Sequence, residues 1–465
     1  MASNLKQLYF VLANEDGSRV FTLQTANGGC IPLYENGVAD HIGFDDPDPY
    51  LQWFEQCCSI PVFRRYIVES SFTNETVMVL QRAGTTTDPQ QKADAVWLSH
   101  AEAARIYGHD TVIHQVLLGL PEHYNKSRIM PWVRPEGFQS YLDPMIGRLH
   151  ARSHSHDIPE IRQIKNAYVS TVFRCRMNER DYYLKIPTSV FIREIEIMKL
   201  IREWDVLALP VWIAADEEGA PAILMENMGG SDLPPDASVE QLAVVIEEYA
   251  RFQICAMKHI EVDKPFPFYD YRTSTLTGHV DTIAEAAREL LQDSPYRLSE
   301  EEQSDLVASL PYWKGLCERI ASYSFPDSID HGDLRPGNIR LTANGIVFFD
   351  WAWSAVTHPF FSIVSFLHVI RRSLSDSDKA YLRDAYLEQW SGFGPRAALL
   401  ELYEIIEEVR DLYFVIGDIR WLKDIWEALE WNTPQPVSPD AWTMERRQYY
   451  FARVLRRLIK PRYST

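Results

Sequence analysis

The chain has 465 residues, of which 46% are hydrophobic and 24% charged, the balance of a globular protein with two or three domains. The net charge of −19 argues against a nucleic-acid partner, whose phosphates would be repelled; it is compatible with a cationic small substrate, although solubility alone also explains it. No apolar run reaches the roughly 18 residues of a membrane span, no secretory signal is visible, and six scattered cysteines indicate reduced thiols in the cytoplasm.

Residues 1–150 predict a small separate α+β domain. Its strand-like runs alternate apolar residues and are separated by Gly, Asp and Asn: "QLYFVLAN", "RVFTLQT", "RYIVES" and "TVMVLQR". Two helices are expected at "DPYLQWFEQCC" and at "SHAEAARIYG", the second with a serine cap. The order of these elements resembles the Nudix hydrolase fold, but the catalytic signature of that family is missing after "CIPLYENG". We therefore expect an accessory domain that binds or packs and does not hydrolyse.

Residues 130–160 are predicted to be a connector with one helix and a stretch rich in His, Ser and Arg. Three histidines, His150, His154 and His156, raise the question of a metal site. No matching set of acids or cysteines accompanies them, so a solvated hinge is the preferred interpretation.

Residues 151–228, which include the end of this connector, predict a strand-rich lobe. "QIKNAYVSTVFRCRMNERDYYLKIP" is typical of three strands, "VFIREIEIMKLIREW" of a helix, and "ALPVWIAADEEGAPAILMEN" of two further strands. Residues 229–465 are mostly helical by periodicity. The predicted fold is therefore α+β, with two lobes that form a cleft where they join.

The stretch "IDHGDLRPGNIRLTANGIVFFDW" carries the chemistry. Asp333 and Asn338 fall on a loop that holds a proline and a glycine, and Asp350 is predicted to end a short buried strand. Three oxygen-bearing side chains brought together in this way suit a divalent cation and a reacting hydroxyl.

"HGDLRPGN" followed by "VFFDW" resembles the signature of the aminoglycoside phosphotransferase and choline kinase family, which has a protein-kinase-like fold. The resemblance covers roughly residues 161–465. It implies a kinase that uses ATP and Mg²⁺ to phosphorylate a hydroxyl of a small molecule. Asp333 would orient that hydroxyl and take its proton, while Asn338 and Asp350 would ligate Mg²⁺. His331 is expected to have a structural role, and Arg335 either contacts phosphate or substrate or is a surface arginine.

The resemblance also assigns nucleotide contacts in the strand-rich lobe. Lys185 matches the family's phosphate-binding lysine, and Glu194 matches the glutamate that pairs with it, with Glu196 as the alternative. "AILMENMGG" resembles the hinge, where the carbonyl of Glu226 and the amide of Met228 would bind the adenine edge.

Several positions depart from the family pattern. The predicted phosphate-covering loop "KNAYVSTVF" contains no glycine, so Ser170 and Thr171 are expected to donate to the phosphates instead. Ser362 stands where many members of the family have an aspartate, which leaves the support of the catalytic loop in question. Trp351 after Asp350 favours a small-molecule kinase over a protein kinase.

Acceptor recognition in this family depends on the C-terminal helices. The segment 403–431 holds acids and aromatic residues that could bind a cation, such as an amino sugar or amino alcohol: Glu404, Glu407, Glu408, Asp411, Asp418, Tyr413, Trp421 and Trp426. At helical spacing, the same residues also suit a core and a solvated face. The rival function is a pseudokinase or nucleotide-binding scaffold whose N-terminal domain binds a partner. The acceptor, the choice between ATP and GTP, and a homodimeric state stay open.

Overall fold

The computed structural model describes residues 7–12, 19–25, 28–34, 48–58, 62–69, 75–82, 95–107, 109, 111–124, 135–154, 157, 159–166, 170–205, 212–216, 221–260, 267–370, 374–431 and 444–459. The chain divides into two compact units. Unit 1 comprises Met1–Phe191, Trp212–Asn227 and Ile425–Thr443, and unit 2 comprises Ile192–Val211, Met228–Asp424 and Met444–Thr465. The predicted domain boundaries at residues 150 and 228 stay predictions. None of the described helices is both long and apolar enough to cross a membrane.

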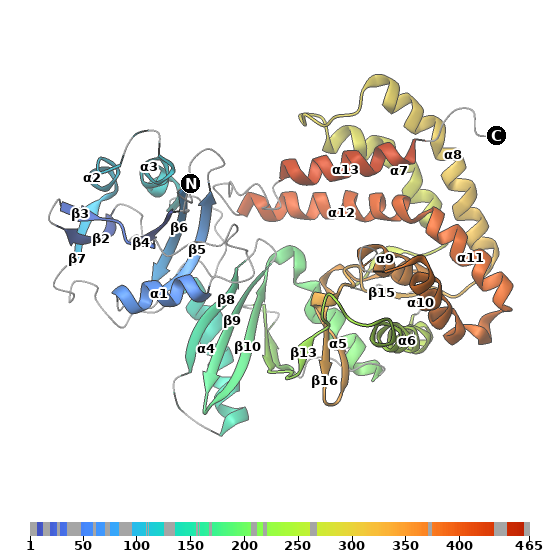
Figure 1. The fold of residues 1–465 in the computed structure, drawn as a ribbon, viewed down its shortest axis with the longest axis horizontal. Helices are drawn as coiled ribbons and strands as arrows, with labels where there is room; N and C mark the ends of the chain where they lie inside the picture. The colour runs from blue at the N-terminus through green and yellow to red at the C-terminus, as the bar shows by residue number, and fades with distance from the viewer. Residues whose placement is uncertain are drawn as a thin grey trace. The chain divides into compact units, whose positions relative to one another are not determined.

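Where the structure describes it, the first part of unit 1 contains two sheets and three helices (Figure 1). One sheet has the order β4-β1-β6-β5: Leu33–Tyr34, Gln7–Leu12, Glu75–Arg82 and Val62–Glu69. The other has the order β3-β2-β7: Gly28–Cys30, Arg19–Thr25 and Ala95–Ser99. The helices are α1, α2 and α3: Asp48–Cys58, His100–Ala104 and Val112–Tyr124. Both predicted helices are confirmed, and Ser99 forms a capping box with Glu102 at the start of α2.

A five-stranded antiparallel sheet forms the second part of unit 1. Its order is β11-β12-β10-β9-β8: Trp212–Asp216, Ala222–Glu226, Arg180–Pro187, Ser170–Met177 and Glu160–Asn166. The five predicted strands are thus confirmed. Strands alternate their side chains between two faces. In β10, Tyr182, Leu184 and Ile186 are buried on one face, which leaves Lys185 on the other.

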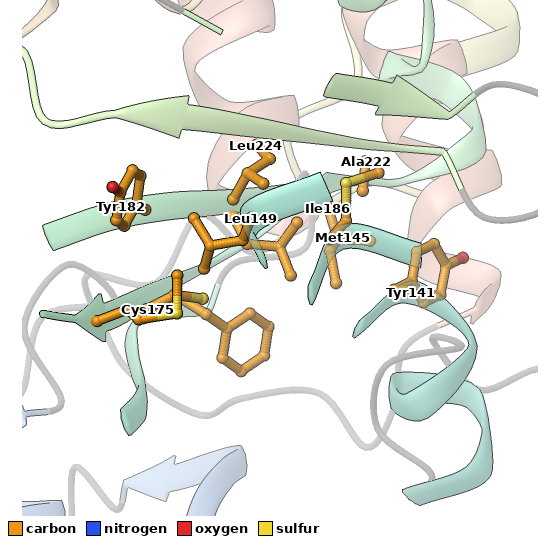
Figure 2. Packing of buried hydrophobic residues seen from close by; sticks show 11 residues of the cluster. Tyr141, Met145, Leu149, Cys175, Tyr182, Ile186, Ala222 and Leu224 are labelled. Atoms are coloured by element: carbon orange, nitrogen blue, oxygen red, sulfur yellow. The ribbon is translucent and has the colours of Figure 1, made fainter. Parts of the chain in front are cut away.

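Helix α4 (Pro135–Ser153) packs against the buried face of this sheet. Tyr141, Met145 and Leu149 recur every four residues, so they share one side of the helix. Figure 2 shows them in one cluster with Ile186, Leu224 and other side chains of β9, β10 and β12. A helix was predicted in this connector, but its place in the core was not. His150 Nε2 lies 3.0 Å from the carbonyl of Asp157, and His156 lies outside the described residues.

Unit 2 is mainly helical, as predicted (Figure 1). Its longer helices are α5 to α13: Arg193–Trp204, Val239–Ala256, Leu276–Leu290, Glu300–Ser322, Phe360–Ile370, Asp376–Gln389, Arg396–Glu408, Arg410–Trp431 and Met444–Leu458, with the end of α12 assigned to unit 1. The periodicity of residues 397–416 indicates one continuous helix, but the helix is interrupted at Val409, between α11 and α12. No Gly or Pro marks this break, which is why the periodicity alone did not show it.

Two small three-stranded sheets in unit 2 contain the strands on either side of the motif. One has the order β13-β16-β17, and the other β14-β18-β15: Ser231–Asp232, Ile339–Thr342, Gly345–Phe348, Tyr269–Tyr271, Ala355–Thr357 and Ser328–Asp330. Asp350 was predicted as the last residue of its strand; it lies two residues beyond the end of β17.

Candidate active site

The loop after β15 brings Asp333, Arg335 and Asn338 together. The Asn338 amide Nδ2 donates to the Asp333 carbonyl and to its Oδ2, both at 2.8 Å. Arg335 Nε donates to the same Oδ2 at 3.1 Å. Because both donors converge on Oδ2, the other carboxylate oxygen, Oδ1, is the atom suited to accept a substrate proton. The Asp333 side chain is 37% exposed, so a substrate can reach it.

The orientation of Asn338 fits a metal ligand. Its side chain is buried and ends a short 3₁₀ turn, Pro336–Asn338. Both bonds to Asp333 use the amide nitrogen, so the amide oxygen is the atom that remains for a cation. Amide and carboxylate oxygens are the ligands that Mg²⁺ prefers, and this ion commonly keeps several waters and only one or two protein ligands.

Asp350 has a left-handed backbone, with φ +69° and ψ +60°. This conformation is unfavourable for a residue with a Cβ atom, although Asp tolerates it better than most. The surrounding loop must therefore hold it in place, which is typical of functional sites.

The loop that holds Asp333 and Asn338, here called the catalytic loop, is hydrogen-bonded to the loop that holds Asp350. His331 Nε2 lies 3.0 Å from the carbonyl of Phe349, and the Phe349 amide donates to the Asn338 carbonyl at 3.1 Å. Gly332 has φ +76°, and a Cβ atom there would lie 2.2 Å from the Trp353 carbonyl oxygen, so only glycine fits. The two loops thus hold Asp333, Asn338 and Asp350 in one region of unit 2.

His331 has the structural role that was predicted. Its ring is fully buried, and burial lowers the pKa of the imidazole. In the neutral form, Nε2–H donates to the Phe349 carbonyl while Nδ1 accepts from the Asp333 amide at 3.4 Å. The His331 ring therefore bridges the catalytic loop and the loop that holds Asp350.

A buried network of hydrogen bonds holds the end of β15, directly before the catalytic loop. Asp330, on β15, accepts hydrogen bonds from the hydroxyls of Ser362 and Tyr413, each at 2.7 Å. Gln253 Nε2 donates to Ser362 Oγ at 3.0 Å and to the Ile329 carbonyl at 2.9 Å. At the position where many members of the family have an aspartate, Ser362 is therefore bonded to a carboxylate at the end of β15. Asp330 was not among the predicted site residues, although its buried position at the end of a strand directly before the motif was a signal.

The predicted nucleotide residues fall in both units. Lys185 lies on β10 in unit 1, and Glu194 is buried in the first turn of α5 in unit 2. Their pairing stays a prediction. Ser170 and Thr171 are buried at the start of β9, where the Thr171 hydroxyl donates to the Lys165 carbonyl at 2.9 Å. A bond from Thr171 to phosphate would have to replace this one.

The predicted hinge begins at the end of β12. Glu226 accepts two hydrogen bonds from Arg152 of α4, at 2.9 Å from Nε and 2.8 Å from Nη2. Met228 begins the next segment of unit 2 and is followed by two glycines with left-handed backbones. The predicted adenine contacts use backbone atoms of Glu226 and Met228, and Glu226 is paired with Tyr182 of β10 at the end of β12.

Two of the predicted aromatic acceptor residues already have partners among the described residues. Tyr413 bonds to Asp330, and the face of Trp421 is covered by the Arg447 guanidinium, 3.4 Å from the ring centre. Asp411 pairs with Arg410. The three glutamates of α11 are exposed, and the side chain of Trp426 lies outside the described residues.

Residues 160–400 match the family model described as "Phosphotransferase enzyme family". No curated protein matches the sequence. Among solved structures, a choline kinase from Cryptosporidium parvum Iowa II is 15% identical, with a TM-score of 0.47 over 68% of this chain and 95% of that one. A choline/ethanolamine kinase family protein from Mesorhizobium loti is 16% identical, with a TM-score of 0.44 over 70% and 97%. The ADP-bound aminoglycoside phosphotransferase APH(2'')-Ib is 16% identical, with a TM-score of 0.43 over 68% and 99%.

Proposed function

This chain belongs to the phosphotransferase enzyme family and is a small-molecule phosphotransferase, and on that premise we propose that it transfers the γ-phosphoryl group of ATP to a hydroxyl of its substrate with the help of Mg²⁺. The arrangement of Asp333 and Asn338 carries the proposal. One side chain presents a carboxylate oxygen to a proton, and the other presents an amide oxygen to a cation.

Each side chain then has one role. Asp333 accepts the proton of the substrate hydroxyl and aligns that oxygen for attack. Arg335 neutralises part of the charge on Asp333, and we assign to it a contact with phosphate or substrate. Asn338 and Asp350 would hold Mg²⁺, which when bound neutralises charge on the phosphate oxygens. We assign nucleotide binding to Lys185, Glu194 and the hinge backbone.

The acceptor assignment stays coarser. We propose a hydroxyl-bearing small molecule, with an amino sugar or amino alcohol as the first class to test. The test is incubation with Mg-ATP and a metabolite extract, followed by mass spectrometry for any compound that gains a phosphoryl group. Asp333→Asn should lower turnover at least about 1,000-fold without loss of fold or of nucleotide binding, because the proton acceptor is removed and the loop is kept.

Full turnover by Asp333→Asn would refute the assignment of Asp333. Tight binding of Mg-ATP by the wild type, with no phosphorylated product from any extract, would favour the nucleotide-binding scaffold instead.

A further inference from the structure

Helix α5 begins with an arginine, next to the predicted nucleotide-site glutamate. Arg193 is its first residue, and Glu194 its second. A cation at a helix N-terminus is unfavourable, because the amides there already carry partial positive charge. The stability of α5 therefore gives no reason for arginine at this position.

The Arg193 guanidinium is held on two sides. Its Nε donates to the Ala352 carbonyl at 2.8 Å, and its Cζ lies 3.2 Å from the centre of the Tyr269 ring. Ala352 lies two residues after Asp350, in the 3₁₀ turn Trp351–Trp353. Tyr269 lies on β14, which pairs with the strand that follows this turn. Arg193 thus connects α5 to the segment that carries Asp350.

The aromatic side of this contact is itself fixed. The Tyr269 hydroxyl donates to Asp424 of α12, and Arg420 Nε forms an ion pair with the same carboxylate at 3.0 Å. The ring consequently cannot rotate away from Arg193 without breaking its bond to Asp424.

Stabilisation of the fold alone does not account for Arg193. Its Nη2 is buried and has no hydrogen-bond partner in the part of the chain that the structure describes. Burial also lowers the pKa of the guanidinium. An unpaired buried donor and a desolvated charge both oppose folding, and a methionine of similar length would avoid both.

The backbone conformation of Asp350 explains why an arginine stands at position 193. Its left-handed conformation needs support from both sides. His331 holds the Phe349 carbonyl, one residue before it, and Arg193 holds the Ala352 carbonyl, two residues after it. Asp350 therefore lies between two anchored carbonyls, and one of the anchors comes from α5.

We propose that Arg193 is a positioning residue that fixes the Asp350 carboxylate for Mg²⁺ and ties its place to that of Glu194. This inference rests on the proposed function, since it requires that the site bind a metal–nucleotide complex. It predicts that Arg193 contributes to the gain in nucleotide affinity caused by Mg²⁺, and not to the affinity for nucleotide alone.

Calorimetry on the full chain can separate these two affinities. The Kd of ATP is measured in EDTA and in excess Mg²⁺ for wild type, Arg193→Met and Arg193→Lys. For Arg193→Met we expect the Kd in EDTA to stay within about twofold, and the Kd in Mg²⁺ to rise about tenfold, the loss expected from one hydrogen bond to a charged group. Arg193→Lys keeps the charge without the Nε geometry, so it should show the same selective loss.

Arg383→Met is the matched control. Arg383 also lies over a ring, 6.0 Å from the centre of Tyr403, on helices that carry none of the residues assigned to the nucleotide or to Mg²⁺. It should change neither Kd. Tyr269→Leu removes the ring that supports Arg193 and should repeat the selective loss even if Arg193→Met does not fold.

Three outcomes are distinguishable. Unchanged binding in Mg²⁺ by folded Arg193 variants would overturn the inference, and so would an equal loss with and without Mg²⁺. A wild-type protein that binds Mg-ATP no better than ATP alone would overturn the inference together with the metal assignment of the proposed function.

Discussion

The bond between Tyr413 and Asp330 gives the sharpest test of the network under the catalytic loop. Tyr413→Phe removes only the hydroxyl that donates to Asp330 Oδ2 at 2.7 Å. The ring would keep its stacking on Phe361, with a centroid distance of 4.1 Å. The change therefore isolates one hydrogen bond to a buried carboxylate, which is 2% exposed.

The expected cost follows from the charge of the acceptor. A hydrogen bond to a charged group contributes about 1.5–3 kcal/mol, against about 1 kcal/mol for a neutral pair. Tyr386→Phe tests the neutral case, because its hydroxyl donates to Gln253 Oε1 at 2.5 Å and the Pro359 carbonyl at 3.0 Å. Tyr403→Phe, a buried ring on α11 outside this network, should cost less than about 0.5 kcal/mol.

Urea denaturation followed by tryptophan fluorescence measures all three variants, since Trp351 and Trp390 are buried in unit 2. The urea midpoint should be lowest for Tyr413→Phe, intermediate for Tyr386→Phe and highest for Tyr403→Phe. The slope of the transition should be the same for all three variants. Turnover of Tyr413→Phe should also fall, because Asp330 precedes Asp333 by three residues. A midpoint for Tyr413→Phe equal to that for Tyr403→Phe would refute the reasoning.

Three further predictions follow from single sites. Gly230→Ala should cost at least about 3 kcal/mol and Gly229→Ala only about 1–2, since both have left-handed backbones but only Gly230 would place a Cβ atom 1.9 Å from the Leu341 carbonyl oxygen; equal midpoints in urea would contradict this. Burial raises the pKa of Asp418 to about 6, above its unfolded value near 4, so this carboxyl destabilises the folded state increasingly as pH rises from about 4 to about 6. Asp418→Asn should accordingly gain stability over wild type across that interval, and a gain independent of pH would count against the buried carboxyl. Lys185→Ala should weaken ATP binding at least about tenfold through loss of a charged phosphate contact, measured by calorimetry, and unchanged affinity would remove Lys185 from the site.

The catalytic loop was predictable because its chemistry is local in sequence. Asp333 and Asn338 are five residues apart on a turn marked by Pro and Gly, and a short hydrogen-bonded loop brings such residues together wherever it lies. The strands of the five-stranded sheet were predictable for the same reason, since each has its own alternation and its own turns.

Contacts between distant segments left no such pattern. Arg193 and Ala352 are 159 residues apart, and nothing near Arg193 indicates a carbonyl partner. The strands of the two small sheets are two to four residues long, too short for an alternation to show. Helix α4 did carry a signal, in Tyr141, Met145 and Leu149, but its polar neighbours made it look like part of a connector.

The packing of α4 has a practical consequence for anyone who shortens this protein. The family match starts at residue 160, which invites a truncated version that begins there. Such a fragment would strip away Tyr141, Met145 and Leu149 and lay bare Leu184 and Leu224 on the sheet that carries Lys185. It would also lack Arg152, which forms an ion pair with Glu226 beside the predicted hinge. An expression boundary before Pro135 keeps this covering layer on the sheet.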